Sequence, residues 1–377
     1  MRAFLRDLAK RIKKDEPLRK RFVSFIHRMV TRSKELFVDF RELWIALLIL
    51  IVVGGTSLGM LFLLASPNED ETTDDVTITT EVYRHPLTGL RLLEPLAELP
   101  QVFSVMVENS ADAWPLVGLD KAFLVIEAPV EGTIPRFIAF FSEESDAEKI
   151  GPVRSARPYY LDWALELDAL YGHSGGSPEA LLAIDSMGIL DLNEFSQGEY
   201  YYRENGSRYA PHNLYTSIDR LVLALEELAP EVPSYESWTF KDDEPVQGDG
   251  ASLSVDFAEG TIYDVIWKYL PETNIYERYQ SGFVMEMEDG ATIEANNVVV
   301  MATGIRTIDS IGRKSIITVG SGDAFLIQDG VFSLIQWEKE SASDRLKFTY
   351  YGGTDVEFNA GVTWIEVVSG IEQVEIE

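Results

Sequence analysis

The sequence contains no cysteine and only about half as many basic as acidic residues. Without cysteine it cannot form disulfides, thiolate zinc sites, iron–sulfur clusters, a cysteine nucleophile or a lipid anchor on cysteine. With 32 Lys and Arg against 62 Asp and Glu, the formal net charge of −30 argues against nucleic acid as a general partner. Hydrophobic residues make up 46% of the 377 positions, which excludes a disordered polyelectrolyte and suggests about two domains with attachments.

One uncharged run separates two regimes of charge. Residues 1–42 carry 13 basic and 6 acidic side chains, a net of +7, whereas the rest of the chain carries a net of −37. Between them, residues 43–65 (LWIALLILIVVGGTSLGMLFLLA) have no charge, and a helix of that length spans the roughly 30 Å hydrocarbon core of a bilayer. The run has no polar stripe and is longer than the apolar part of a signal peptide. It therefore predicts a single-pass transmembrane helix.

The flanking charges predict the orientation of this helix. Because Lys and Arg concentrate before it, the positive-inside rule predicts residues 1–42 in the cytoplasm and the chain after residue 65 outside the cell membrane. Within the cytoplasmic segment, apolar residues from Leu18 to Met29 are spaced for one helical face among Arg and Lys. Such a segment is typical of a helix that lies on anionic headgroups, and a cytoplasmic protein or nucleic-acid partner is the alternative.

The extracytoplasmic part begins with residues 66–83, which are acidic, rich in Thr and poor in large apolar side chains, and therefore predict a solvated stalk. Residues 84–230 predict a mixed α/β domain, because apolar runs of strand length alternate with segments of helical spacing. The expected strands are 102–107, 123–128 and 136–141, and the expected helices are 159–167, 178–187 and 219–228.

The remainder of the chain has a different pattern. Residues 231–250 contain two Pro, two Gly and an acidic run, which indicates an interdomain linker or an ordered crossing strap. In residues 251–377, short runs rich in Val, Ile, Tyr and Trp alternate with Gly-Asp, Asp-Gly and Gly-Gly pairs, and Asp329-Gly330 predicts a hairpin. The predicted fold is a transmembrane anchor plus an α+β ectodomain whose C-terminal domain is β-rich and mostly antiparallel.

Several short motifs together resemble one protein family. They are HPLTG at 85–89, IGPVRSARP at 150–158, HSGGSP at 173–178, PHN at 211–213, GSG at 320–322 and GVTWI at 361–365. In these motifs the chain resembles the DUF3048 family over nearly the whole ectodomain, with an N-terminal and a C-terminal family domain. The resemblance implies a bacterial cell-surface protein without an established activity.

The chain departs from the family pattern in its anchor and in two motifs. Family lipoproteins are anchored through an acylated cysteine, whereas this chain is expected to use a helix. The family pattern of Asp-Asn is Glu108-Asn109 here, and that of Val-Glu-Gly-Gly-Ile-Thr-Arg is VEGTIPR at 130–136. A chemical role of the missing Asp or Thr would therefore not apply to this chain.

Residues 172–176 (Gly-His-Ser-Gly-Gly) fit the nucleophile elbow of hydrolases, because a short strand is expected before them and a helix after them. Ser174 would be the nucleophile, and His212 is the only histidine downstream that could serve as its base. The separation of 38 residues is short for an α/β-hydrolase, no HGGG-type oxyanion segment precedes the motif, and the family resemblance centres on His173. A Gly-rich turn that caps a helix is the favoured interpretation.

The same turn also fits an anion site. Gly175, Gly176 and Ser177 precede a predicted helix, so their backbone N–H groups and the helix dipole favour a negative charge. Arg154, Arg157 and Arg208 would add forked donors for phosphate or carboxylate. The alternative is that these arginines form structural ion pairs with Glu127, Glu131 or Asp162.

Other chemistry has weaker support. His173 and His212 with Glu108, Glu127 or Glu131 would make a metal set, but their spacing is not diagnostic and no calcium loop is present. Trp337, Trp364 and Tyr350 could stack on sugar rings, although their strand spacing favours core positions.

These patterns predict a membrane-anchored extracytoplasmic envelope protein with one polar pocket in its first half. The candidate catalytic residues are His173, Ser174 and His212, and the candidate ligand-binding residues are Arg154, Arg157, Gly175, Gly176, Ser177, Arg208 and Asn213. The expected ligand is an anionic envelope component such as a peptidoglycan fragment, with no cofactor and no metal. Two alternatives stay open: a hydrolase that uses Ser174 or a water activated by a His–carboxylate pair, and a scaffold that recruits a cytoplasmic partner through residues 1–42.

Overall fold

The computed structural model describes residues 82–377 except 207, 229–231, 247–248 and 258–261. The predicted cytoplasmic segment, the predicted transmembrane helix (43–65) and most of the predicted stalk lie outside the described residues. Among the residues that are described, no helix is long and apolar enough to cross a bilayer.

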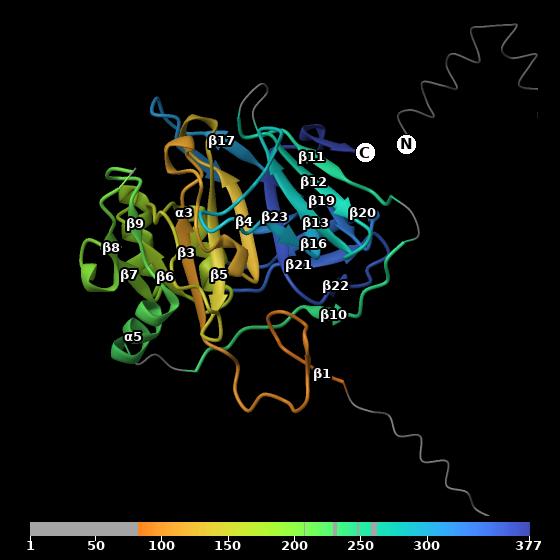
Figure 1. Cartoon of the computed structure of the whole chain (residues 1–377), viewed down its shortest axis with the longest axis horizontal. Coiled ribbons are helices and arrows are strands. Elements are labelled where there is room, and N and C mark those ends of the chain that lie inside the picture. The colour runs from red at the N-terminus through yellow and green to blue at the C-terminus, as the bar shows by residue number, and fades with distance from the viewer. Residues whose placement is uncertain (1–81, 207, 229–231, 247–248, 258–261) are drawn as a thin grey trace, which may run out of the picture. The chain divides into compact units, whose positions relative to one another are not determined.

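A ten-stranded sheet is the centre of the described structure and takes five strands from each predicted half (Figure 1). Its strand order is β21-β20-β19-β16-β23-β4-β5-β3-β6-β7. The first half contributes β3 (Val102–Val107), β4 (Leu124–Pro129), β5 (Pro135–Ser142), β6 (Leu170–His173) and β7 (Asp191–Asn193). The second half contributes β16 (Asn297–Ala302), β19 (Gly320–Gln328), β20 (Val331–Lys339), β21 (Lys347–Tyr350) and β23 (Thr363–Val368). The halves meet where β23 pairs in parallel with β4.

The second half is β-rich and mostly antiparallel, as expected, and its described strands include one parallel pair, β16 with β23. β16 pairs antiparallel with β19 and parallel with β23, because the last long strand of the chain inserts between β16 and β4 and runs in the same direction as both. The predicted hairpin is confirmed, since β19 and β20 are antiparallel with Gln328 opposite Val331. Asp329 and Gly330 have φ of 56° and 72°, the left-handed pair that a type I′ turn requires.

Side chains on the two faces of this sheet enter two cores. In β16, Val298 and Val300 belong to one core, and Val299 and Met301 belong to the other, as the two-residue period of a strand requires. The first core also receives α5 (Ile218–Leu228) and a second sheet. The second core is covered by α3 (Pro158–Leu165) and α4 (Pro178–Met187). The three predicted helices therefore all form.

The second sheet has six strands and comes from the second half of the chain. Its order is β14-β13-β12-β11-β24, with β15 also paired to β13. The strands are β11 (Leu253–Val255), β12 (Val265–Leu270), β13 (Ile275–Gln280), β14 (Phe283–Val284), β15 (Glu294–Ala295) and β24 (Val374–Ile376). Trp267 of β12 packs edge-to-face on Trp364 of β23 at 5.2 Å, which joins the two sheets. Trp337 and Trp364 are each 1% exposed, so both are core residues.

Two further contacts tie the halves together. Glu166, just after α3, accepts hydrogen bonds from Lys339 Nζ at 2.8 Å and from Arg345, and all three side chains are buried. In the predicted linker, β10 (Thr239–Lys241) pairs in parallel with β22 (Glu357–Asn359). The remaining strands form three short antiparallel pairs: β1 (Tyr83–Arg84) with β2 (Arg91–Leu92), β8 (Tyr202–Arg203) with β9 (Leu214–Tyr215), and β17 (Ile305–Thr307) with β18 (Lys314–Ile316).

Candidate functional site

Residues 154–157 (Arg-Ser-Ala-Arg) supply the backbone of the predicted site. The Arg154 N–H donates to Met106 O of β3 at 2.8 Å, and the Ala156 N–H donates to Gly175 O at 2.9 Å. Pro158 begins α3, and Arg157 before it is extended, with φ −134° and ψ 150°. The segment therefore connects β3, the Gly-rich turn and the start of α3.

Arg136 of β5 and Arg157 donate to consecutive carbonyls of this segment. Arg136 Nη1 lies 2.7 Å from Ser155 O, and Arg157 Nη1 lies 2.7 Å from Ala156 O. Arg157 also holds Glu131 through two bonds of 2.6 and 2.8 Å. Arg136 is 7% exposed and has no carboxylate partner among the described residues. Burial lowers the pKa of Arg136, and the charges of Arg157 and Arg154 lower it further. Arg136, Arg154 and Arg157 are the arginine cluster.

Glu108, directly after β3, joins Arg154 to His212. Arg154 Nε lies 3.2 Å from Glu108 Oε1, and His212 Nδ1 lies 3.0 Å from both oxygens of that carboxylate. The Glu108 side chain is 3% exposed, whereas His212 and Arg154 are each 23% exposed. A buried carboxylate thus orients a histidine ring whose other nitrogen has no partner within the described part of the chain.

Ser174 does not meet His212 as the nucleophile elbow would require. Its hydroxyl donates to Glu194 Oε2 at 3.0 Å, and Glu194 also pairs with Arg203 at 3.2 Å. Arg203 in turn donates to Asn213 Oδ1 at 3.3 Å. Ser174 and Asn213, both predicted site residues, therefore belong to one polar network, but Ser174 is paired with a carboxylate and not with an imidazole.

His173 and the Gly-rich turn are satisfied internally. The buried His173 ring contacts Asp191 Oδ1 through Nε2 at 2.6 Å and Gly175 O through Nδ1 at 2.7 Å. Gly175 N–H donates to Asn193 Oδ1, and the Ser177 hydroxyl accepts from Ala180 N–H as the N-cap of α4. These contacts fit a turn that begins a helix, in which the His173 ring, the Gly175 N–H and the Ser177 hydroxyl are already paired.

Arg208 lies apart from the arginine cluster. It donates to Tyr215 Oη at 2.8 Å, to Glu288 Oε2 at 3.2 Å and to Pro115 O. Lys149 pairs with the same Glu288 at 3.2 Å. Arg208 therefore takes part in an ion-pair group that links the two halves of the chain.

Asn109, the neighbour of Glu108, belongs to a different polar cluster. We call it the junction cluster, and its members are Asn109, Glu127, Arg278, Gln280 and Glu366. All five side chains are buried. Arg278 donates to Glu127 Oε2 and to Gln280 Oε1, each at 2.6 Å, and Asn109 donates to Glu127 Oε1 at 2.9 Å. Asn109 and Glu127 come from the first half and the other three residues from the second half, so this polar cluster forms only when both halves meet.

Glu366 lies directly opposite Glu127 across the parallel strand pair. Its Oε1 accepts from Trp267 Nε1 at 2.8 Å, and its Oε2 has no hydrogen-bond donor among the described groups. Burial raises the pKa of Glu366 well above its usual range, and the charge of Glu127 raises it further against the opposing effect of Arg278. Glu366 is therefore a buried carboxyl group for which the fold favours the protonated form.

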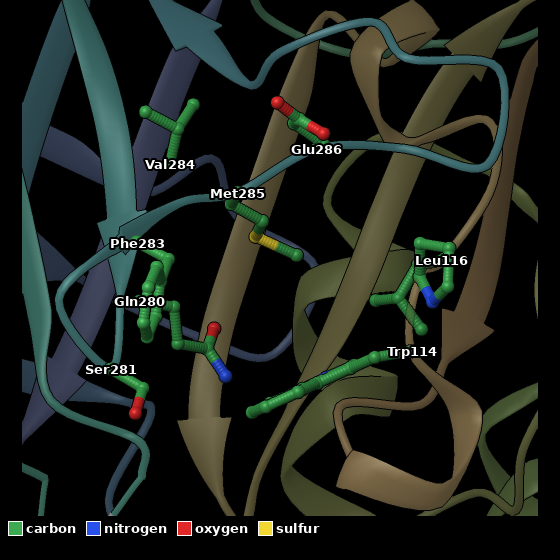
Figure 2. Close-up of a pocket in the computed structure, with 9 residues that line it drawn as sticks. Trp114, Leu116, Gln280, Ser281, Phe283, Val284, Met285 and Glu286 are labelled. Carbon is green, nitrogen blue, oxygen red and sulfur yellow. The ribbon is translucent and has the colours of Figure 1, made fainter.

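A pocket of about 420 Å³ opens beside the junction cluster. It is lined by Trp114, Pro115 and Leu116 of the first half and by Gln280, Ser281, Phe283, Val284, Met285 and Glu286 of the second half. Figure 2 shows Trp114 and Phe283 on opposite sides, with Gln280 between them. We call this the junction pocket.

Metal ligands do not gather within the residues that the structure describes, where no three His, Asp or Glu side chains are placed to hold an ion. His173 and His212 each bind a single carboxylate, Asp191 and Glu108 respectively.

Sequence reasoning did not select Arg136, Arg278, Gln280 or Glu366 of these clusters, or Trp114 of the junction pocket, as site residues. Arg278 and Gln280 stand in a strand whose alternate positions are buried, and Glu366 interrupts the apolar run of β23. A charged side chain at an inward position was the available signal, because such residues are rarely buried unless paired. Trp114 lies in a polar loop and carries no such signal.

Comparison with known proteins defines the class to which this fold and these clusters belong. Residues 87–231 match the N-terminal domain and residues 253–365 the C-terminal domain of DUF3048, a family described as of unknown function. The chain therefore belongs to the DUF3048 family.

YerB of Bacillus subtilis (strain 168), a protein named as a lipoprotein, is a relative. It is 29% identical over 321 residues, which cover 84% of this chain and 94% of YerB. The chain is also similar to the crystal structure of YerB from Bacillus subtilis, with a TM-score of 0.70 and 28% identity over 78% of this chain and 99% of that one.

Proposed function

We propose that this protein is a membrane-associated cell-surface protein that binds an anionic cell-envelope ligand, such as a peptidoglycan fragment, at the arginine cluster. The observation that carries the proposal is the state of Arg136, a buried guanidinium that, among the described residues, donates to one backbone carbonyl and forms no ion pair with a carboxylate. A buried charge without a counter-ion is costly, so a carboxylate or phosphate oxygen would supply the partner that Arg136 lacks.

The local balance of charge agrees with this ligand class. Arg154 and Arg157 are neutralised by Glu108 and Glu131, which leaves the charge of Arg136 in excess. Arginine presents forked N–H groups that match carboxylates and phosphates. The rest of the ectodomain is strongly acidic, so an anion would be attracted to this position and repelled elsewhere.

Location at the membrane is supported by the uncharged run at residues 43–65 and by the relative that is named as a lipoprotein. A reporter enzyme that is active only outside the membrane, fused after residue 377, tests the orientation. We expect activity from this fusion and none from a fusion made after residue 42. The reverse pattern would refute the proposed topology.

Binding is tested with the peptidoglycan stem tripeptide (L-Ala-γ-D-Glu-diaminopimelate) and its fully amidated form, on the full chain in nanodiscs. We expect the acid to bind, and Arg136→Gln to weaken it by about tenfold, the size of one lost bond to a charged group. Arg306→Gln is the control, because Arg306 of β17 is exposed and has no carboxylate partner among the described residues. Equal binding of the acid and the amide would refute the proposal.

A hydrolase is the second candidate, and the Glu108–His212 pair favours it. A carboxylate on Nδ1 orients the ring so that Nε2 can accept a proton from water, which is the role of the His–carboxylate pair in general-base catalysis. Release of fragments from purified peptidoglycan that disappears in His212→Ala, with unchanged thermal stability, would support this candidate. Undiminished release by that variant would exclude His212 as the base.

A further inference from the structure

The junction pocket has two aromatic walls that differ in how they are held by the fold. The Trp114 indole is held by a hydrogen bond from Nε1 to Asn109 Oδ1 at 3.0 Å and by an edge-to-face contact with Tyr263 at 6.1 Å. Phe283, across the pocket, is 77% exposed (Figure 2). A fixed indole and an open phenyl ring facing one space form a slot for a ring with an apolar face.

The floor of this slot offers one hydrogen-bond donor. Gln280 Oε1 accepts from Arg278 at 2.6 Å, which assigns the orientation of the amide. Its Nε2 donates one N–H to Asn109 Oδ1 at 3.1 Å. An amide nitrogen carries two N–H groups, and the second has no acceptor among the described residues. Because Gln280 lines the pocket, this N–H is available to a ligand that carries a carbonyl oxygen.

The charge of the lining excludes anions from the pocket. Glu286 is the one charged residue that lines it, and no basic side chain is present there to pair with an acid. A pure hydrocarbon would leave the amide N–H unsatisfied, which costs free energy. The suitable ligand is therefore uncharged, with one apolar face, an amide carbonyl and hydroxyl groups that reach Ser281 and Glu286 at the rim.

We propose that the junction pocket binds an uncharged N-acetylated pyranose, with the C–H face of the sugar ring against Trp114 and Phe283 and its acetamido carbonyl on Gln280. A sugar of this kind combines an apolar ring face with an amide and hydroxyl groups, and a volume of about 420 Å³ accommodates one or two such rings. This site is separate from the arginine cluster and takes a ligand without charge. Glu108, which pairs with Arg154 of the arginine cluster, and Asn109 of the junction cluster are nevertheless consecutive residues.

The test uses the full chain in nanodiscs with N,N′,N″-triacetylchitotriose as the probe, measured by titration calorimetry and by saturation-transfer NMR. We expect saturable binding below about 10 mM, and cellotriose, which lacks acetamido groups, to bind about tenfold more weakly. Phe283→Ala should raise the Kd about tenfold without affecting folding, because this side chain is exposed.

The matched control is Phe195→Ala. Phe195 is 78% exposed and does not line the pocket, so its loss should leave the Kd unchanged. Trp114→Ala should abolish binding, with thermal unfolding as the check on its fold. Absence of saturable binding, equal affinity for cellotriose, or an equal effect of Phe195→Ala and Phe283→Ala would each overturn the proposal.

Discussion

Glu108 and Asn109 are neighbours in the chain, and their side chains belong to two different polar clusters. Glu108 holds Arg154 and His212, whereas Asn109 contacts Glu127, Trp114 and Gln280. Both residues directly follow β3, and their side chains contact different partners. One peptide bond therefore joins the residue that pairs with Arg154 of the arginine cluster to the residue that holds Trp114 of the junction pocket.

Loss of the Glu108 charge should destabilise the fold measurably. Glu108→Gln removes the carboxylate that Arg154 and His212 contact while keeping the size of the side chain, and we expect the free energy of unfolding to fall by about 1–2 kcal/mol. Urea denaturation of both proteins provides the measurement. Glu204→Gln is the control: Glu204 is 46% exposed in its pair with Lys149, so its effect should stay within about 0.5 kcal/mol. Similar losses in both variants would contradict a special role of Glu108.

Replacing Arg278 should lower the free energy of unfolding more than replacing an exposed Lys or Arg. Arg278→Met leaves the buried Glu127 without a counter-ion, and we expect unfolding to become easier by about 3–5 kcal/mol. Adding Glu127→Gln to this variant should recover part of the loss, because the uncompensated charge is then gone. Lys268→Met on the neighbouring β12 is exposed and should have little effect. If the double variant unfolds at the same urea concentration as Arg278→Met alone, or at a lower one, the loss of stability is not a charge effect.

Glu366 should make stability depend on pH in a predictable direction. Its pKa is raised in the folded state by burial and by Glu127, so the folded protein holds a proton that the unfolded chain releases above about pH 4.5. Stability from this group is therefore present at low pH and is lost as pH rises toward the folded pKa. Urea midpoints at about pH 5, 6, 7 and 8 should fall more steeply in the wild type than in Glu366→Gln. Parallel profiles would show that Glu366 does not titrate in this way.

The N-cap of α4 should contribute less to the free energy of unfolding than Arg278 does. Ser177→Ala removes the oxygen that accepts from Ala180 N–H, and we expect a loss of about 1 kcal/mol in the free energy of unfolding. Ser186→Ala, in the same helix but bonded to a carbonyl three residues earlier, should change stability far less. Thermal denaturation of the two variants distinguishes capping from a general loss of a serine hydroxyl.

Local patterns predicted individual elements well. Ser177 followed by Pro178 marked the start of α4, and Asp329-Gly330 marked the β19–β20 turn. Each is a matter of backbone conformation and of one or two side-chain bonds within a few residues. The parallel pairing of β23 with β4 was not predictable in this way, because these strands are far apart in the chain and their partner choice depends on the whole sheet.

The candidate site likewise combines residues that the sequence identified with contacts that only the fold shows. Arg154, Arg157 and His212 were identified from motifs, but Arg136 gains its significance from the fold, where no described carboxylate forms an ion pair with it. Ser174 fitted a nucleophile elbow in sequence, yet its hydroxyl contacts Glu194. A sequence motif identifies residues that are close in the chain. Which charged side chains pair depends on which parts of the chain pack together in the fold.

The amino-acid sequence by itself determined the absence of thiol chemistry, the acidic character of the long C-terminal part, the uncharged run at residues 43–65 and the β-rich second half. Tertiary structure alone decided that Glu127 and Glu366 face each other, that Arg278 lies beside them, and that Trp114 meets Phe283 across a pocket. The physical reason is that composition and periodicity can be read directly from the chain. A buried charge pair and a pocket wall, in contrast, form only when strands from both halves of the chain pack together.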